Sequence, residues 1–301
     1  MARVAVGGAG PAGTAAALAA VRAGAEVEMW DRSGFPRHKV CGEFLSGEAL
    51  EVLEAIGAAG VVLARKPAWM KRVRLVMGER EKQTRLEREA LGISRNVLDW
   101  ALVEEAQRQG ARLARGEGWP LAAPAVEATG RGVHAARAGA KPGRLFGFKA
   151  HFAGPASDAV ELFFWDGCYV GVNPVEGGLT NVCGLAPQAK LAAVGFEVDE
   201  LLARGGVALR ERLEPLERQW DWITTGPLVF ARRREAAEGV YPAGDALGFV
   251  DPFTGSGQLC ALVSGRLAGL AAAEGWGTRR YLERVEVPRR LLVWVSPLLV
   301  Q

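Results

Sequence analysis

Residues 3–13, RVAVGGAGPAG, decide the fold of this chain. Their first four residues are a short apolar run with the length of a buried strand. Residues 14–23 are rich in alanine, the strongest helix former. Residues 27–30, VEMW, predict a second strand. A strand, a glycine-rich turn, a helix and a further strand together predict a parallel α/β unit.

Three glycines in the turn, Gly8, Gly10 and Gly13, have the spacing GxGxxG between a strand and a helix. In this motif the first glycine permits a tight turn, the second lets a pyrophosphate approach the backbone, and the third lets helix and strand pack closely. Pro11 and Ala12 begin the helix, whose N–H groups and positive end attract a phosphate. The turn therefore predicts a dinucleotide site.

An acidic residue stands where the second predicted strand ends. Asp31 lies about 20 residues beyond the glycines, where a carboxylate can accept hydrogen bonds from ribose hydroxyls. We place Arg32, the next residue, in the same site. The alternative is an ordinary βα unit with a glycine-rich turn, and an acid at this spacing argues against it.

A second glycine-rich segment lies far along the chain. Residues 239–243 predict a strand that leads into Gly244 and Asp245, and residues 258–274 predict a helix. Between them lies the run Gly255-Ser256-Gly257-Gln258, whose glycines let the backbone approach a flat ring. The N-terminus of the helix is a second site for an anion or a carbonyl group.

Residues 244–258, GDALGFVDPFTGSGQ, resemble the GDAxGxxxPxxGxG motif of the para-hydroxybenzoate hydroxylase superfamily. In that superfamily the Asp binds the ribityl chain of FAD, and the following loop lies along the flavin ring. Residues 35–43, FPRHKVCGE, are similar to the PxxKxCG segment of the geranylgeranyl reductase branch, which includes Gly42. Residues 94–102 resemble the helix whose Arg, here Arg95, reaches FAD. Residues 128–131, ATGR, resemble the strand end that returns the chain to the nucleotide fold.

The resemblance implies FAD as the cofactor and an α/β fold. It implies a Rossmann-like three-layer FAD-binding domain, with a parallel sheet and helices, and a smaller substrate domain with an antiparallel sheet. Three separate parts of the chain are expected to form the FAD-binding domain: residues 1–75, 91–131 and 236–278. The rest is expected to form an excursion into the substrate domain, the substrate domain itself and a C-terminal helical segment: residues 76–90, 132–235 and 279–301.

The substrate domain is expected to line a cavity over the flavin. Residues 145–185 predict several strands separated by Gly, Asp, Asn and Pro, and residues 197–213 predict a helix. Residues 168–174, CYVGVNP, fall where geranylgeranyl reductases carry YxWxFP on a cavity strand, which places Tyr169 and Asn173 in the substrate site. Glycine and asparagine replace the Trp and the Phe, so the cavity gains volume and a polar amide. A bulky or more polar substrate fits this pattern better than a long polyprenyl chain.

Cys41 is the candidate catalytic residue. The resemblance places it in a loop near the flavin, where some reductases of the branch carry a cysteine. A role as proton donor or redox partner requires a stabilised thiolate, for which His38 and Lys39 are close in sequence. The alternative is a small residue packed beside Gly42.

Several other aromatic and basic residues are interpreted as structural. Flavin-dependent halogenases of the superfamily carry WxWxIP on the cavity strand, and residues 220–224 of this chain read WDWIT. Thr224 stands where proline is needed, and the segment lies well past that strand, so Trp220 and Trp222 are interpreted as core or sheet-edge aromatics. Lys149 and His151 lie within a predicted strand and are also interpreted as structural.

The leading hypothesis is an FAD-dependent oxidoreductase that reduces or dehydrogenates a carbon–carbon bond of a fairly large apolar substrate. Hydride would be transferred at flavin N5, with protonation by Cys41 or water. One alternative is a monooxygenase that uses NAD(P)H and O2, because both activities occur on this fold. A second is a non-catalytic or partner-dependent FAD-binding protein, motivated by residues 112–120, where relatives usually have several strands. Residues 100–240 hold no second GxGxxG, so either NAD(P)H docks transiently or an electron-donor protein supplies the electrons.

Composition limits the partners. A net charge of +3 with 24% charged residues predicts a globular protein without a nucleic-acid partner. The four cysteines have no metal-ligand spacing, so we expect no metal site and a reducing cytoplasm. No secretory signal is apparent in residues 1–20, and no apolar run reaches the about 20 residues needed to span a bilayer. The apolar residues 291–300 follow two arginines, which leaves a peripheral membrane contact, packing on the core and a partner chain all open.

Overall fold

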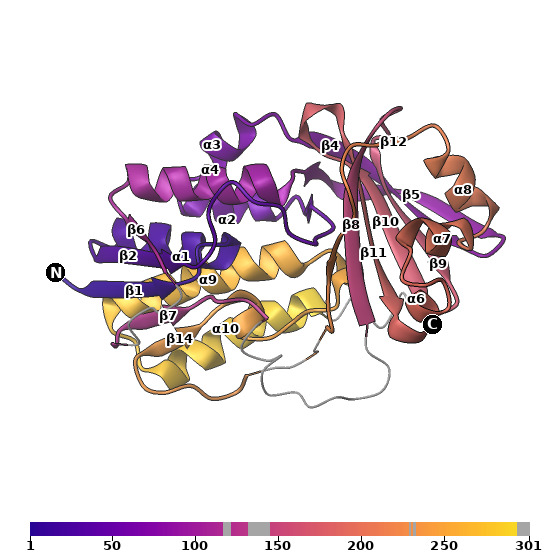
Figure 1. The fold of residues 1–301 in the computed structure, drawn as a ribbon. Helices are drawn as coiled ribbons and strands as arrows, with labels where there is room; N and C mark the ends of the chain where they lie inside the picture. The colour runs from indigo at the N-terminus through magenta and orange to yellow at the C-terminus, as the bar shows by residue number, and fades with distance from the viewer. Residues whose placement is uncertain (117–121, 132–144, 229, 231–232, 294–301) are drawn as a thin grey trace.

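The computed structural model describes residues 1–116, 122–131, 145–228, 230 and 233–293, without the side chains of residues 287–293. Two sheets lie side by side, one in each half of the molecule (Figure 1). One sheet is parallel and covered by helices, and the other is large and mostly antiparallel. The predicted α/β fold class is confirmed.

The parallel sheet is assembled from both ends of the chain. Its strand order is β14-β7-β1-β2-β6, and every neighbouring pair runs parallel. The strands are β1 (Arg3–Gly7), β2 (Glu26–Asp31), β6 (Arg112–Arg115), β7 (Ala125–Glu127) and β14 (Val240–Pro242). Because β7 pairs with both β1 and β14, it joins the two glycine-rich segments in one sheet.

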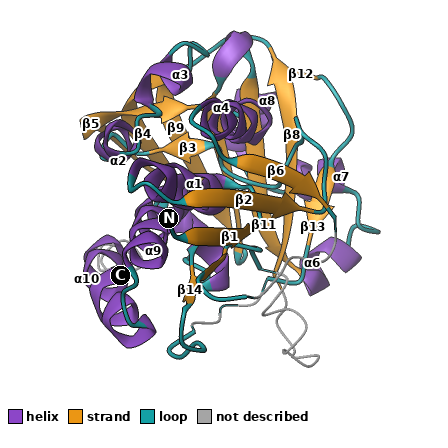
Figure 2. Ribbon diagram, turned by 90° about the vertical axis from the view of Figure 1, so that its left-hand side faces the viewer, coloured by secondary structure: helices purple, strands orange, loops and turns teal. Residues whose placement is uncertain are grey.

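A layer of helices covers one face of the parallel sheet (Figure 2). The helices of this half are α1 (Pro11–Arg22), α2 (Ala49–Ala55), α3 (Ala59–Leu63), α4 (Arg95–Arg108), α9 (Gly257–Glu274) and α10 (Thr278–Val293). Alternate residues of the central strands, such as Val4, Val6 and Met29, are buried beneath the alanines of α1. This alternation gives the sheet one apolar face for the helices.

Helices α1 and α9 pack unusually closely. A Cβ atom added to Gly265 would lie 2.1 Å from the carbonyl oxygen of Ala12, and one added to Gly269 would lie 2.1 Å from that of Ala16. Real side chains do not approach a backbone oxygen so closely, so only glycine fits at these two positions. The contact therefore holds the second glycine-rich segment against the first.

The second sheet has the strand order β12-β8-β11-β10-β9-β4-β5-β3, with β13 also paired to β8. Its strands are β3 (Phe44–Leu45), β4 (Ala68–Met77), β5 (Arg80–Gly92), β8 (Leu145–Ala153), β9 (Ala159–Trp165), β10 (Cys168–Pro174), β11 (Thr180–Pro187), β12 (Glu217–Arg218) and β13 (Ile223–Thr225). The neighbours pair antiparallel except β4 and β9, which run parallel. The predicted antiparallel sheet is thus mixed, because the β4–β5 hairpin joins it beside β9.

Two boundaries differ from the prediction. The hairpin covers residues 68–92, so it begins inside the segment expected to belong to the FAD-binding domain. Charged residues are scattered through β4, which hides the alternation that would have marked a strand. The helix expected over residues 197–213 is two helices, α7 (Val198–Ala203) and α8 (Val207–Leu213), because Gly206 has a φ of 86°.

The two faces of the second sheet have different surroundings. Helices α6 (Gln188–Ala192), α7 and α8 share a core with one face, whose residues include Phe148, Val170 and Val182. The opposite face is turned toward the parallel-sheet half, where the loops after β2 and β14 meet it (Figure 1). This arrangement leaves the candidate site between the two halves.

The C-terminal apolar segment falls largely outside the described residues. Helix α10 continues to Val293, and the side chains from residue 287 onward are not described. Among the described residues, no helix is both long enough and apolar enough to cross a membrane. The expected membrane, core or partner contact of this segment stays a prediction.

Replacing Gly269 by Ala should lower the free energy of unfolding by at least about 2 kcal/mol, because the new methyl group would force α1 and α9 apart. Thermal unfolding followed by circular dichroism measures the loss. Gly60→Ala in α3 is the matched control, since a Cβ there would meet nothing within 4 Å. Equal stability of the two variants would contradict the close contact.

Candidate active site

The first glycine-rich turn is held by close backbone packing. Gly8 has a φ of +98°, and a Cβ atom there would lie 2.3 Å from the carbonyl oxygen of Ala128. A Cβ atom at Gly13 would lie 1.7 Å from the carbonyl oxygen of Gly8. Gly10 is the N-cap of α1 and has no side chain to bond the first N–H groups. These groups and the positive end of α1 are left for an anion.

Asp31 is already saturated by the protein. Its carboxylate accepts hydrogen bonds from the backbone N–H groups of Ala9 and Ser33, both at 2.9 Å, and two from Arg37 at 2.6 and 2.9 Å. A carboxylate offers about four acceptor positions, so a ribose hydroxyl would have to displace one of these donors. The expected ribose contact of Asp31 stays a prediction, and the structure shows it holding the turn and Arg37. Arg32 beside it is exposed.

Three basic residues gather beside the first turn. Arg95 pairs with Asp99 at 2.6 Å, and its guanidinium would lie 3.5 Å from a Cβ atom at Gly10. Lys39 is half-buried and forms no ion pair within the part of the chain that the structure describes. Burial, followed by the charges of Arg37 and Arg95, lowers the pKa of Lys39. Cations crowded at a positive helix end repel one another, and a pyrophosphate would relieve this repulsion.

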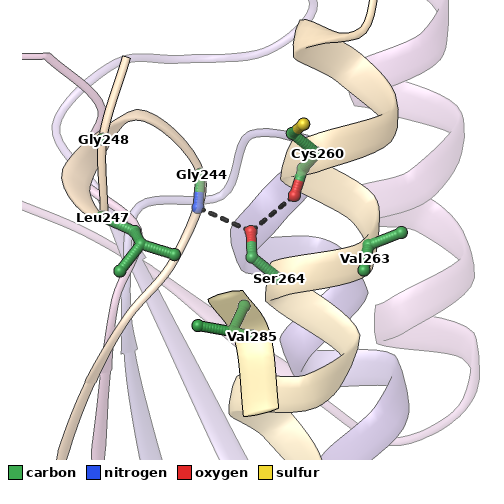
Figure 3. A pocket seen from close by; sticks show the side chains of 7 residues that line it. All are labelled: Gly244, Leu247, Gly248, Cys260, Val263, Ser264 and Val285. Carbon is green, nitrogen blue, oxygen red and sulfur yellow. Dashed lines mark hydrogen bonds between the residues drawn. The ribbon is translucent and has the colours of Figure 1, made fainter. Parts of the chain in front are cut away.

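The second glycine-rich segment is fixed to α9 (Figure 3). The N–H of Gly244, in the 3₁₀ turn Gly244–Ala246, donates to Ser264 Oγ at 2.9 Å, and that hydroxyl donates to the carbonyl of Cys260 at 2.6 Å. Asp245 in this turn lies 3.9 Å from Arg131 Nε and is partly exposed. The turn therefore presents Asp245 at a fixed position.

A small hollow lies behind Gly244. It is lined by the residues labelled in Figure 3: Gly244, Leu247, Gly248, Cys260, Val263, Ser264 and Val285. It has room for about one water molecule. A hollow of this size, beneath the turn rather than in front of it, is a packing gap and not a substrate site.

The N-terminus of α9 faces open space. Ser256 is the N-cap residue, but its side chain accepts no hydrogen bond from the helix, and its hydroxyl lies 2.6 Å from that of Thr254. A Cβ atom at Gly42 or Gly257 would meet nothing within 4 Å. Gln258 Oε1 is buried and has no hydrogen-bond donor within the described parts of the chain. Open glycines, free helix N–H groups and an unpaired acceptor fit the edge of a flavin ring, which carries both carbonyl oxygens and an N–H group.

Cys41 lies at the junction of the two halves. Its Sγ accepts hydrogen bonds from the N–H of Glu43 and from Gln258 Nε2, both at 3.4 Å. Asn181 Nδ2 of β11 donates to the carbonyls of Cys41 at 3.3 Å and of Gly42 at 2.9 Å. The loop is thus attached to α9 on one side and to the second sheet on the other.

Arg95 also contacts Cys41. Burial lowers the pKa of Arg95, but the charge and hydrogen bonds of Asp99 and the contact with Cys41 outweigh it and raise the pKa above its usual value. The neighbours expected from the sequence differ from those observed. The ring of His38 packs against His151 and Trp220, with centroids 5.5 and 4.8 Å away. Gln258, Glu43 and Arg95 surround the thiol instead.

Glu43 is a site residue that sequence reasoning missed. Its side chain is fully buried, and its φ of 52° is uncommon for a residue with a Cβ atom. Its carboxylate pairs with Lys149 and with His151 Nε2 at 2.6 Å, and it accepts from the N–H of Arg95 at 2.6 Å. Burial raises the pKa of Glu43, but the hydrogen bond of His151 and the charge of Lys149 outweigh it and lower the pKa. Lys149 and His151, two residues apart on one strand, were the signal that a buried acid must face them.

Three aromatic side chains cluster near Cys41. The ring of Phe164 lies 5.9 Å from that of Tyr169 and 5.2 Å from that of Phe253. Burial, then the neighbouring Cys183, Asp251 and Cys41, raise the pKa of Tyr169 well above its usual value, so its hydroxyl stays neutral. Tyr169, predicted to contact substrate, thus lies near the candidate catalytic thiol.

Other predicted residues lie elsewhere. Asn173 is 1% exposed and donates to the carbonyl of Pro174 at 3.4 Å, so its expected contact with substrate stays a prediction. Trp222 packs on Phe148 and Phe152 at the edge of the second sheet. This agrees with its interpretation as a sheet-edge aromatic.

Short segments of curated proteins and whole folds of solved structures match this chain. The chain is 50% identical over 56 residues to "Menaquinone reductase" of Mycolicibacterium smegmatis, which covers 19% of this chain and 14% of that protein. A protein of the same name from Mycobacterium tuberculosis strain H37Rv matches over 54 residues at 50% identity, which covers 18% of this chain and 13% of that protein. The chain thus matches only a small part of these curated relatives.

Solved structures share the fold over nearly the whole chain. The flavin-dependent brominase Bmp2 matches with a TM-score of 0.79 at 18% identity, over 95% of this chain and 82% of its own. A flavoprotein/dehydrogenase from Cytophaga hutchinsonii matches with a TM-score of 0.78 at 20% identity, over 94% and 79%. At these identities the likeness shows the fold alone.

Replacing Lys39 by Gln should weaken FAD binding about 10- to 100-fold, because the crowded cation loses its contact with the pyrophosphate. The loss should be smaller at high salt, which screens the charges. Titration of the FAD-free protein, followed by flavin fluorescence, measures the dissociation constant. Lys190→Gln, far from the turn on the surface helix α6, is the control, and an unchanged affinity in Lys39→Gln would contradict the cation site.

The family model described as "FAD binding domain" matches residues 1–153, a little over half of the chain. This region contains the first turn, the basic residues beside it, Cys41 and Glu43. The matched residues and the geometry agree that FAD is the cofactor. The chain belongs to the FAD binding domain family and is an FAD-dependent oxidoreductase.

Proposed function

We propose that this oxidoreductase reduces or dehydrogenates a carbon–carbon bond of a fairly large apolar substrate. The observation that carries the proposal is the place of Cys41. Its Sγ lies beside the N-terminus of α9, held by Gln258 and the N–H of Glu43, and next to the aromatic space of Tyr169 and Phe253. Such a reaction needs a proton donor between the loop expected to lie along the flavin and the apolar side chains expected to contact the substrate.

Each part of the site has a task in this reaction. Bound FAD supplies hydride transfer at its N5 atom. The first turn and Lys39 would hold the pyrophosphate, and Asp245 would bind the ribityl chain. Tyr169 and Phe253 exclude water from the reacting carbons, and Cys41 gives up or takes the proton that balances the hydride. The segment of high identity to menaquinone reductases supports a reductase, since those relatives carry that name.

A monooxygenase is the second candidate. The observation in its favour is the fold, which this chain shares with flavin-dependent brominases and other halogenases. Because one fold serves both chemistries, product analysis must decide between them. Electrons would come from NAD(P)H or a donor protein in either case.

The test uses the FAD-loaded protein, reduced anaerobically with dithionite and mixed with menaquinone in D2O. We expect reoxidation of the flavin without oxygen and a product that has gained two deuterium atoms on carbon, because the N5 hydrogen and the thiol proton both exchange with D2O. Cys41→Ser should slow product formation at least about 100-fold, the usual effect of a general acid, with its flavin spectrum unchanged. Cys183→Ser is the matched control and should remain active.

Two results would count against the proposal. A product that gains oxygen, or reoxidation that occurs only after air is admitted, would replace the reductase with the monooxygenase. Full activity of Cys41→Ser together with loss in Tyr169→Phe would move the proton to the tyrosine hydroxyl.

A further inference from the structure

The face of the second sheet that forms the candidate site continues beyond it. Directly paired residues on neighbouring strands point to the same face. The pairing of β11, β10, β9, β4 and β5 gives one row across the sheet: Cys183, Gly171, Leu162, Leu75 and Lys82. The adjacent row is Leu185, Tyr169, Phe164, Met77 and Arg80. Both rows start beside the Cys41 loop and end at two cations.

The middle of these rows is apolar and partly open. We call Leu75, Met77, Leu162 and Phe164 the apolar strip. Met77 is 56% exposed, and the other three are only partly buried. On the reverse face of the same strands, Val76 and Phe163 are 6% and 1% exposed beneath the helices. The strip is therefore apolar surface that extends outward from the candidate site.

The outer end of the strip carries charges without partners. Arg80 and Lys82 form no ion pair in the described part of the chain, which includes both residues and all of β4 and β5. On β4 the arginines of the reverse face are neutralised. Arg74 pairs with Glu81 at 2.8 Å and with Glu161 at 3.0 Å, and Arg72 bonds Asp158 at 2.8 Å. Two uncompensated cations thus close an apolar path.

We propose that the strip binds the body of an elongated apolar substrate whose anionic end, a carboxylate or a phosphate, is held by Arg80 and Lys82. This rests on the proposed function, because the reacting end then lies at Gly171 beside Cys41. From Gly171 on β10 to Lys82 on β5 the row crosses three strand spacings of about 4.8 Å, which gives a path of about 14 Å. At Gly171 a Cβ atom would be in ordinary contact with Leu162 Cδ2, at 3.4 Å, so the strip reaches the glycine without a gap.

The test measures binding rather than turnover. The FAD-loaded full chain is titrated calorimetrically with dodecanoate, dodecyl phosphate and dodecanol, which share a chain and differ at one end. The double variant Arg80→Glu/Lys82→Glu should raise the dissociation constants of both anions about tenfold or more and leave that of dodecanol unchanged. A loss confined to one anion also supports the site and identifies that anion as the preferred end.

Arg85→Glu is the matched control. Arg85 lies on β5 directly opposite Arg72 in the strand register, on the reverse face of the sheet. Reversing the charge of Arg85 should therefore change none of the three affinities. Leu162→Asn should weaken all three ligands, including dodecanol, with thermal unfolding confirming that the variant is folded.

Three results would overturn the proposal. Equal affinities of the double variant and the unaltered protein would mean that Arg80 and Lys82 only prevent the edge strand from pairing with another chain. Failure of the unaltered protein to bind any of the three ligands would remove the site. A dimer in sedimentation that Met77→Glu dissociates would assign the strip to a second copy. Since no step requires flavin reduction, failure of the reductase test would leave these measurements interpretable.

Discussion

The close contact of α1 with α9 is the constraint on which the rest of the structure depends. The glycines of α9 let it touch the backbone of α1, and a Cβ atom at Gly244 would in turn lie 2.8 Å from that of Ala12. The positive ends of the two helices are therefore fixed relative to one another, although more than 240 residues separate their first turns. A single ligand that carries phosphates at one end and a polar flat ring at the other can satisfy both helix ends. FAD has this form, and we expect its two ends to lie at the crowded Lys39 and at the unpaired Gln258 Oε1.

The second sheet completes the site by holding one loop. Hydrogen bonds of Glu43 and Asn181 connect residues 41–43 and the start of α4 to strands β8 and β11. A further hydrogen bond, from Ser94 to Glu176, connects the start of α4 to the turn after β10. A buried carboxylate with two basic partners adds little net stability, since burying the charges costs about as much as their attraction returns. Its effect is on position. It fixes the thiol of Cys41 where the second glycine-rich segment, the N-terminus of α9 and the aromatic side chains of the second sheet meet.

The sequence predicted the parts of the site that depend on local geometry. The turn at Gly8 and the helix starting at Gly257 follow from motifs whose spacing is set by backbone sterics, and the resemblance to the reductase branch implied the place of Cys41 near them. It could not predict contacts made across the fold. No local pattern indicates that Arg37 donates hydrogen bonds to the carboxylate of Asp31. Nor does one indicate that Glu43 contacts Lys149 and His151, which lie on a strand more than 100 residues away. The parallel pairing of β4 with β9 was missed for the same reason, because pairing partners are set by the assembled sheet and not by the alternation within one strand.

The central claim is that the two ends of this chain hold FAD in a site built for carbon–carbon redox chemistry rather than for oxygen. The most direct measurement is the absorption spectrum of the purified protein, followed by anaerobic reduction and admission of air. The account predicts flavin absorption bands, complete bleaching on reduction and slow reoxidation when substrate is absent. A colourless protein that cannot be loaded with FAD would contradict the assembly of the site, and rapid reoxidation by air would contradict the reductase.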